Sequence, residues 1–279
     1  MSRTQSILAK HRIRPKKRLG QNFLFDESAL YSIVKAADIT SEDRVLEIGA
    51  GIGNLSAFIA EKAGTFYALE KDASLKKILT ENLSPFTNTQ IIFADILDFG
   101  LASPAQGKKL KIIGNLPYYI TSPILLRLIE QKNFIESILI TVQKEVAQRI
   151  VAKPGTKDYG RLSCLLQFHC EASILAQFSR RQFTPRPDVD STLVRLRILE
   201  KPSVNVVSEQ IFFQTVKAIF AQRRKTLLNG LCAGNFGLER EKLKEILQEV
   251  NIDAGIRGEK LSLAEIGKLS DKINSKKNT

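Results

Sequence analysis

The sequence is poor in the residues that build metal sites and disulfide frameworks. Its 279 residues include three cysteines, two histidines and no tryptophan. Cys164, Cys170 and Cys232 form no Cys-x-x-Cys pair, so we expect neither a zinc site nor a disulfide scaffold. We predict no bound metal, and this cysteine usage is typical of a reducing, cytoplasmic compartment.

Long hydrophobic runs are also lacking. The longest uncharged stretch lies between Lys111 and Arg127 and contains Asn115, Pro117 and Pro123. A membrane helix needs roughly 18 consecutive apolar residues, so we expect no membrane span. The 43% hydrophobic and 25% charged content argues against a disordered or fibrous chain and predicts a soluble globular protein.

Acidic residues are missing from the start of the chain as far as Asp26. The same stretch holds seven of the 42 basic residues: Arg3, Lys10, Arg12, Arg14, Lys16, Lys17 and Arg18. In a chain with a net charge of +13, such a basic arm predicts a polyanionic partner, for example a nucleic acid. A solvated basic tail and an organelle transit peptide are the alternatives.

The order of the hydrophobic patterns predicts an α/β fold. Apolar runs rich in β-branched residues predict strands at 44–48, 65–69, 90–94, 111–114, 137–142, 173–177 and 192–198. Amphipathic stretches predict helices at 54–62, 73–82 and 122–131, the last capped by Thr121 with Pro123 in its first turn. This alternation predicts a mainly parallel, buried sheet with an antiparallel edge.

After Glu200 the pattern becomes helical. Residues 201–205 are typical of a linker, and helices are predicted at 209–220, 240–250 and 263–269. The predicted organisation is a basic arm at 1–25, an α/β domain at 26–202 and a small all-helical domain at 203–279.

The strongest local motif is a glycine-rich turn that runs from Glu47 to Gly53 as EIGAGIG, directly after the first predicted strand. Glycines let the backbone turn sharply and approach a ligand closely. The Gly-x-Gly-x-x-Gly fingerprint of dinucleotide-binding proteins fails on its register, because Asn54 stands where the last glycine should be. The motif therefore predicts a cofactor site around Gly49, Gly51 and Gly53.

Carboxylates follow three strands at the edge where such sheets bind ligands. Glu47 ends the first strand, and Glu70 lies at the tip of the second, where it could accept both ribose hydroxyls. Asp95 follows the third strand and could accept from an adenine amine. Carboxylates suit a sulfonium or aminoacyl cation better than a pyrophosphate, so the residues favour S-adenosylmethionine over NAD.

A second motif, Asn115, Leu116, Pro117 and Tyr118, follows the fourth predicted strand. An amine conjugated with a purine is a poor nucleophile and must be pyramidalised before it is methylated. The Asn115 side-chain carbonyl and the Leu116 backbone carbonyl could accept its two hydrogens, and Pro117 fixes the turn. Tyr118 offers a face for stacking the base, so the motif predicts a flipped-out purine as methyl acceptor.

Several motifs together form a recognisable set. The chain carries LGQNFL at 19–24, the glycine turn at 47–53, Glu70, Asp95, NLPY at 115–118, FTPRPDVDS at 183–191 and AQRRKTLLN at 221–229. Over nearly its whole length it thereby resembles the ribosomal small-subunit RNA adenine N6-dimethyltransferases of the KsgA (RsmA) type. The resemblance implies a Rossmann-like, S-adenosylmethionine-dependent methyltransferase domain followed by a small helical domain.

The same resemblance implies a reaction and a partner. Two methyl groups would be transferred to the N6 amine of each of two adjacent adenosines, in a stem-loop near the 3′ end of 16S ribosomal RNA. The partner would be the immature small ribosomal subunit, and the enzyme a cytoplasmic monomer.

The resemblance also implies site residues. Phe183 would stack on the target base opposite Tyr118. The cofactor pocket would be formed by Gln21, Asn22, Leu24, Glu47, Gly49, Gly51, Gly53, Glu70, Lys71, Asp95, Ile96 and Asn115. Contacts with RNA would come from Arg14, Lys16, Lys17 and Arg18 in the arm and from Arg223, Arg224 and Lys225 in the helical domain.

Two other functions stay open at this point. One is a ribosome-assembly or RNA-binding factor in which catalysis is incidental. The other keeps the enzyme class and moves the target to large-subunit RNA, as in antibiotic-resistance adenine methyltransferases. DNA adenine methylation is disfavoured, because such enzymes usually carry a second proline where Leu116 stands.

Overall fold

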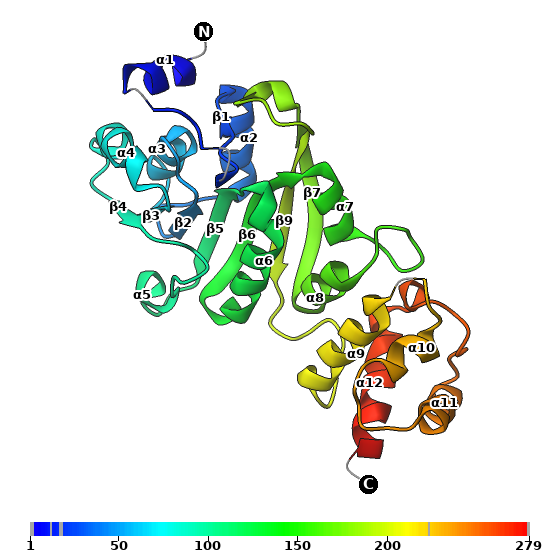
Figure 1. Ribbon diagram of the computed structural model, residues 1–279. Helices are drawn as coiled ribbons and strands as arrows, with labels where there is room; N and C mark the ends of the chain where they lie inside the picture. Colours follow the sequence, from blue (N-terminus) through cyan, green and yellow to red (C-terminus); the bar gives the residue numbers. More distant parts are fainter. Residues whose placement is uncertain (1–2, 12, 17–18, 223, 278–279) are drawn as a thin grey trace. The chain divides into compact units, whose positions relative to one another are not determined.

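The computed structural model describes residues 3–11, 13–16, 19–222 and 224–277. The chain forms two compact units (Figure 1). The first, here called the sheet unit, comprises the chain up to residue 147 together with residues 172–198. The second, the helical unit, comprises residues 148–171 and 199–279.

A seven-stranded sheet dominates the sheet unit. Its strands are β2 (Arg44–Ile48), β3 (Thr65–Glu70), β4 (Thr89–Phe93), β5 (Leu110–Asn115), β6 (Ile135–Gln143), β7 (Cys170–Phe178) and β9 (Ser191–Ile198). Their order across the sheet is β4-β3-β2-β5-β6-β9-β7. The pairs from β4 to β6 are parallel, and β6 pairs antiparallel with β9. The predicted mixed, mainly parallel sheet is confirmed.

Helices and short turns precede these strands or connect them. The helices are α1 (Arg3–Lys10), α2 (Glu27–Ala37), α3 (Asn54–Ala60), α4 (Lys76–Leu83), α5 (Ala102–Ala105), α6 (Thr121–Glu130) and α7 (Lys144–Val151). The 3₁₀ turns are η2 (Ala73–Leu75), η3 (Tyr118–Ile120), η4 (Lys132–Phe134) and η5 (Arg180–Gln182). In a separate small sheet, β1 (Phe23–Leu24) pairs antiparallel with β8 (Phe183–Thr184).

The burial of the central strands explains their sequences. In β2 and β3 every residue after the first is buried, as expected of a parallel sheet covered on both faces. Val45, Phe66 and Ile113 are at most 1% exposed and share a hydrophobic cluster with Ile33 of α2 and Ile59 of α3. Strands covered on both faces need apolar residues in succession, which is the pattern from which they were predicted.

Two helix starts differ from the prediction. Thr121 is not the cap of α6, because the helix begins at Thr121 itself and the Thr121 hydroxyl donates to the Pro117 carbonyl (3.1 Å). Pro123 does lie in the first turn. The helix predicted at 73–82 is divided, since the Asp72 side chain caps η2 by accepting from the Ser74 N–H before α4 begins.

The helical unit contains α8 (Arg161–His169), α9 (Glu209–Ala221), α10 (Leu227–Cys232), α11 (Arg240–Glu249) and α12 (Leu263–Lys277), with the turn η6 (Gly258–Lys260). The helices predicted at 209–220 and 240–250 are confirmed, and α12 is longer than the predicted 263–269. No helix in the described part of the chain is both long and apolar enough to span a membrane.

The compact units do not follow the predicted boundary at 202/203. Residues 148–171, which we expected in the α/β domain, belong to the helical unit. Phe168 stacks on Phe212 with ring centroids 4.5 Å apart. Tyr159 and Cys164, both fully buried, lie in the same hydrophobic cluster. This grouping depends on contacts between distant segments, for which the local sequence carries no signal.

The last position of β5 that pairs with β2 accepts only glycine. Gly114 pairs with Ile48, and a Cβ added at residue 114 would lie 2.7 Å from the Ile48 backbone oxygen. Backbone cannot move aside as a flexible side chain can. The close approach of β2 and β5, directly before Asn115, therefore requires a residue without a side chain.

We expect Gly114→Ala to lower the free energy of unfolding by about 1 to 3 kcal/mol, the usual cost of overpacking a core. Gly100→Ala is the matched control, because a Cβ at residue 100 meets nothing within 4 Å. Urea unfolding of both variants, followed by circular dichroism, measures the difference. Equal unfolding free energies would contradict the crowding at Gly114.

Candidate functional site

The strand register brings the predicted site residues to one edge of the sheet. The last paired residues of β2, β3 and β5 lie side by side. The next positions in line are Gly49, Glu70 and Asn115, and Asp95 follows two residues after the end of β4. Residues that are up to 66 positions apart in the sequence therefore meet at the carboxyl ends of the strands.

A pocket of about 1050 Å³, part of it open to solvent, lies at this edge. Most of the predicted cofactor residues line it: Gln21, Asn22, Leu24, Glu47, Gly49, Gly51, Glu70, Lys71, Asp95, Ile96 and Asn115. Leu116, Pro117 and Tyr118 of the predicted acceptor motif line the same pocket. The predicted residues Gly53 and Phe183 are not among the lining residues.

The glycine turn has the backbone that only glycine adopts readily. Gly49, Gly51 and Gly53 have φ angles of 77°, 62° and 89°, in the left-handed region that other residues avoid. Gly53 precedes α3 as its N-cap, and a Cβ there would lie 3.3 Å from Leu79. In this structure Gly53 serves the turn, whereas Gly49 and Gly51 reach the pocket.

Glu70 is held by backbone amides. Its carboxylate accepts from the Gly51 N–H (2.8 Å) and from the Asp72 N–H (2.7 Å), and the residue is 7% exposed. Burial is the largest effect and raises the pKa of Glu70, although both hydrogen bonds lower it. A turn whose amide already serves a carboxylate has less to offer a pyrophosphate.

Asp95 is paired with its neighbour Lys71. The Lys71 ammonium donates to Asp95 Oδ2 (2.5 Å), and the Leu97 N–H donates to Oδ1 (3.0 Å). Burial raises the pKa of Asp95, but the bonds from Lys71 and Leu97 outweigh it and lower the pKa. The Lys71 side chain is half exposed, and an exposed ion pair is weak enough to open for a ligand.

Glu47 is the most deeply buried carboxyl of the pocket. It is 2% exposed, and its Oε2 accepts from the Ser56 hydroxyl of α3 (2.5 Å). Burial raises the pKa of Glu47 to about 8, despite the hydrogen bond from Ser56. The group is therefore mainly protonated at pH 7, and a cation bound beside it would favour its ionised form.

Asn115 has its amide orientation set by its partner. Its Nδ2 donates to the Asn22 backbone carbonyl (2.8 Å), so Oδ1 is the end that remains to accept a hydrogen bond. Asn115 is partly exposed and lines the pocket. The site therefore presents an acceptor oxygen of the kind that the sequence predicts for a target amine.

The rest of the acceptor motif is fixed by neighbouring strands. The Leu116 N–H donates to the Thr141 carbonyl of β6 (3.2 Å), and Leu116 is 2% exposed. The Tyr118 hydroxyl forms a hydrogen bond with the Ser191 hydroxyl of β9 (2.6 Å). With its hydroxyl tied to a strand, the Tyr118 ring has little rotational freedom at the pocket wall.

Phe183 differs from its predicted role. Its side chain is 2% exposed and packs in the hydrophobic cluster that contains Leu24, Leu139 and Leu193. A ring in the core has no face to offer a base, so in this structure Phe183 contributes to the hydrophobic core.

The predicted RNA-contact residues lie in both units. Arg14 is exposed in the sheet unit, whereas Lys16 is partly buried and bonded to Asp72. Arg224 and Lys225 are exposed in the helical unit. The remaining three, Lys17, Arg18 and Arg223, lie outside the described residues.

Sequence reasoning missed two residues of this region. Asp72, two positions after Glu70, is 4% exposed and accepts hydrogen bonds from the segment before β1. Tyr119, the second of two consecutive tyrosines, lines the pocket and is 54% exposed. The spacing of Asp72 from Glu70 and the tyrosine pair were the signals available for them.

Most of the chain matches one known family. The family model for ribosomal RNA adenine dimethylase matches residues 12–269. The chain belongs to this family. It is therefore an rRNA adenine dimethyltransferase, and its cofactor is S-adenosylmethionine, as predicted.

Relatives of this dimethylase cover almost its full length. The ribosomal RNA small subunit methyltransferase A of Alkaliphilus metalliredigens (strain QYMF) is 43% identical over 276 residues, which are 98% of this chain and 96% of the relative. The protein of the same name from Clostridioides difficile (strain 630) is 43% identical over 277 residues, with the same coverage.

Solved structures share the fold of the dimethylase. A dimethyladenosine transferase from Plasmodium falciparum matches with a TM-score of 0.77 at 24% identity, over 90% of this chain and 97% of that one. The 23S rRNA methyltransferase ErmE matches with a TM-score of 0.69 at 25% identity, over 90% and 99%. The predicted Rossmann-like methyltransferase fold with a helical C-terminal region is confirmed.

The pocket chemistry of the dimethylase fits its cofactor. An adenosyl group brings hydroxyl and amine donors, and a sulfonium amino acid brings positive charge. The pocket offers three carboxyl groups, those of Glu47, Glu70 and Asp95. Among the described lining residues Lys71 is the one cation, and it is already paired with Asp95.

We expect the buried Glu47 to make stability depend on pH. The folded state holds this proton up to a pKa of about 8, against an ordinary value of 4.5. Between these values the folded chain binds more protons than the unfolded one, so the Glu47 contribution to stability is complete below pH 4.5. It is lost as pH rises, at about 1.4 kcal/mol per unit.

Glu47→Gln removes this titration while keeping the shape, so its unfolding free energy should fall less steeply than that of the wild type between pH 5 and 8. Urea titrations at four pH values measure the slopes. Exposed Glu42 gives the control, Glu42→Gln, which should follow the wild type. Parallel curves for wild type and Glu47→Gln would show that Glu47 ionises normally.

Proposed function

We propose that the enzyme dimethylates the N6 amines of two adjacent adenosines near the 3′ end of 16S ribosomal RNA, in the immature small subunit. The observation that carries the adenine chemistry is the orientation of Asn115, whose Oδ1 is left as an acceptor at the pocket wall. The small-subunit target is supported by the relatives at 43% identity over 98% of the chain, against 25% for ErmE.

Binding of the adenosyl group falls to the carboxylates at the strand ends. Glu70 accepts from the ribose hydroxyls while the backbone amides of the two turns hold its carboxylate in place. Asp95 accepts from the adenine amine when Lys71 releases it. S-adenosylmethionine, when bound, supplies a methyl group on a sulfonium centre.

Activation of the acceptor falls to the 115–118 motif. Asn115 Oδ1 and the Leu116 carbonyl accept the two hydrogens of the target amine, which turns its lone pair out of conjugation with the ring. Tyr118 stacks on the purine, at about 1 to 3 kcal/mol for such a contact, and its bond to Ser191 fixes the ring beforehand.

No strong base is required by this arrangement. The methylated amine is far more acidic than the free one and loses its proton to water. The rate enhancement then comes mainly from holding the reactants in line, an effect that can reach about 7 to 11 kcal/mol. Residues that orient the amine therefore matter more than residues that titrate.

Recognition of the RNA uses basic side chains on both units. Exposed Arg14, Arg224 and Lys225 contact phosphates and orient the stem-loop, and the target adenosine leaves its stack to enter the pocket. We propose a monomer that acts in the cytoplasm; the three free cysteines are consistent with a reducing compartment.

Asn115→Ala should lower kcat about 100-fold or more, because it removes a preorganised hydrogen-bond acceptor for the amine. Steady-state methylation, with unmethylated small subunits and S-adenosylmethionine both saturating, measures kcat. Asn205→Ala, at an exposed position of the linker, is the control and should keep full activity. A kcat within threefold of the wild type would remove Asn115 from the mechanism.

Affinity for RNA should fall steeply with salt, since binding releases counterions from the phosphates. Arg224→Gln and Lys225→Gln should each reduce the slope of log K against log salt by about one. Lys242→Gln provides a matched control, because Lys242 is paired with Glu245 in the same unit (2.8 Å). Slopes that are the same for all variants would exclude Arg224 and Lys225 from the RNA contact.

The decisive test of the target uses labelled S-adenosylmethionine. The enzyme is incubated with unmethylated small and large subunits, and the labelled nucleotide is mapped. Label on two adjacent adenosines near the 3′ end of 16S ribosomal RNA is the expected result. Label confined to the large subunit would overturn the proposed substrate and leave the enzyme class intact.

A further inference from the structure

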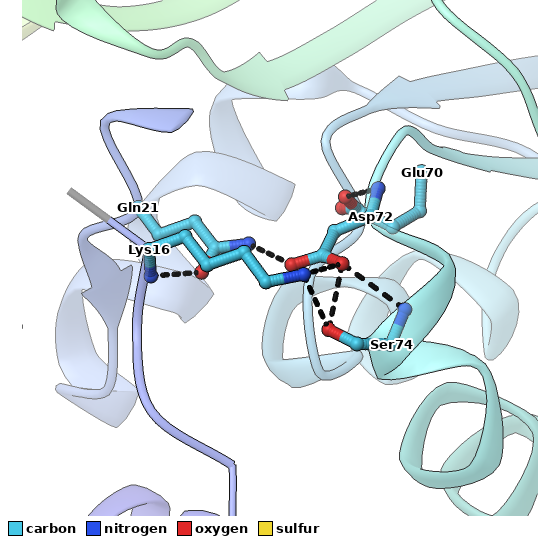
Figure 2. Close-up of polar contacts among 5 residues, drawn as sticks. All are labelled: Lys16, Gln21, Glu70, Asp72 and Ser74. Carbon is cyan, nitrogen blue, oxygen red and sulfur yellow. Dashed lines mark hydrogen bonds and ion pairs between the residues drawn. The ribbon is translucent and has the colours of Figure 1, made fainter. Parts of the chain in front are cut away.

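Asp72 is a buried carboxylate that does not line the pocket and has no role in the function proposed above. It is 4% exposed and lies in the turn between β3 and η2. Its side chain accepts from Lys16 Nζ (2.6 Å), Gln21 Nε2 (2.8 Å), the Ser74 N–H (3.0 Å) and the Ser74 hydroxyl (2.6 Å). Figure 2 shows Lys16 and Gln21 reaching this carboxylate from a separate segment of the chain.

The carboxylate is ionised in the folded protein. Burial, the largest single effect, raises the pKa of Asp72, but the hydrogen bonds from Lys16, Ser74 and Gln21 together lower it to about 2. An ionised, nearly inaccessible group with this many donors makes strong, charge-assisted hydrogen bonds. Hydrogen bonds from Lys16 and Gln21 thus connect the segment before β1 to the turn after β3.

These hydrogen bonds fix the position of the Gln21 side chain. Gln21 Oε1 accepts from the Lys16 N–H (2.8 Å), while Gln21 Nε2 donates to Asp72. Both ends of the amide are therefore used, and Lys16 and Gln21 are bonded to each other as well as to the same carboxylate.

The same segment forms one wall of the pocket. Gln21 and Asn22 line it, and the Asn22 carbonyl accepts from Asn115. On the opposite side of Asp72, its backbone N–H donates to Glu70 (2.7 Å). Asp72 therefore connects the residue proposed to bind the ribose with the segment that holds the amine acceptor.

We infer that Asp72 is a positioning residue, which anchors Gln21 and Asn22 as the wall that completes the S-adenosylmethionine site. The inference rests on the proposed function only in taking this pocket as that site. It also gives Lys16 a second role beside the predicted RNA contact, because its ammonium supports the cofactor site through Asp72.

Asp72→Asn tests the anchor with little change in shape. If the asparagine oxygen keeps Lys16 and Ser74, its NH₂ group faces Gln21 Nε2, and two donors cannot bond. The Gln21 side chain then turns away and releases the wall. We expect the Kd for S-adenosylhomocysteine, measured by calorimetry on the full chain without RNA, to rise at least tenfold.

A matched control separates this role from a loss of stability. Asp43 is another carboxylate of the sheet unit that is bonded to a lysine, Lys111 (2.9 Å), and it does not line the pocket. Asp43→Asn should lower Tm by an amount similar to Asp72→Asn and leave the Kd unchanged. Hydrogen exchange of peptides from 19–24 should quicken in Asp72→Asn alone.

A swapped pair gives the second test. Gln21→Glu alone brings two carboxylates together and should weaken binding. In the double variant Gln21→Glu/Asp72→Asn, the introduced asparagine amide can donate to the introduced glutamate, which restores the bond and the wild-type charge. We expect the Kd of the double variant to be lower than the value obtained by multiplying the increases in Kd of the two single variants. If Asp72→Asn does not fold, the Kd of the double variant is compared with that of Gln21→Glu alone.

Two results would overturn the inference. One is a Kd of Asp72→Asn within twofold of the wild type. The other is a double variant that binds no more tightly than Gln21→Glu, or whose increase in Kd equals the product of the increases in the two single variants. Failure of the proposed function is distinguishable, because S-adenosylhomocysteine binding needs no RNA: a wild type that binds it but labels no 16S adenosine fails only as the proposed enzyme.

Discussion

The parallel register of β2 with β3 and β5 is the constraint on which the site depends. Because the three strands end level, Gly49, Glu70 and Asn115 meet at one edge, although they come from separate parts of the chain. Gly114 permits the close approach of β5 to β2. The residues proposed to bind the cofactor and those proposed to bind the acceptor adjoin because hydrogen-bonded backbone, rather than flexible side chains, sets their spacing.

Burying an ionised carboxyl group is energetically unfavourable, and the protein offsets this in three ways at this edge of the sheet. Glu47 keeps its proton, Glu70 is bonded to backbone amides, and Asp72 is bonded to Lys16 and Gln21. Each solution avoids an isolated buried charge. Together they leave a pocket that is rich in acceptors and favours a ligand with donors and positive charge, which is the chemistry of an adenosyl sulfonium.

Much of the sheet unit could be predicted because its determinants are local. The run at 44–48 matches β2 to the residue, and the other central strands were placed within two residues, since strands covered on both faces need consecutive apolar residues. The glycine turn was also readable, because its left-handed backbone restricts the residue type. The helix α2 was not predicted, although the Asp26 side chain caps it.

The sequence by itself determined the strands, the glycine turn, the turn at 115–118 that follows β5 and the order of the carboxylates along the edge. Only the tertiary structure decided that Phe183 is buried, that residues 148–171 join the helical unit through Phe168, and that Lys16 pairs with Asp72. The physical reason is distance along the chain. Periodicity and turn chemistry report on neighbours a few residues away, whereas burial, protonation and ion pairing depend on which distant segments pack together.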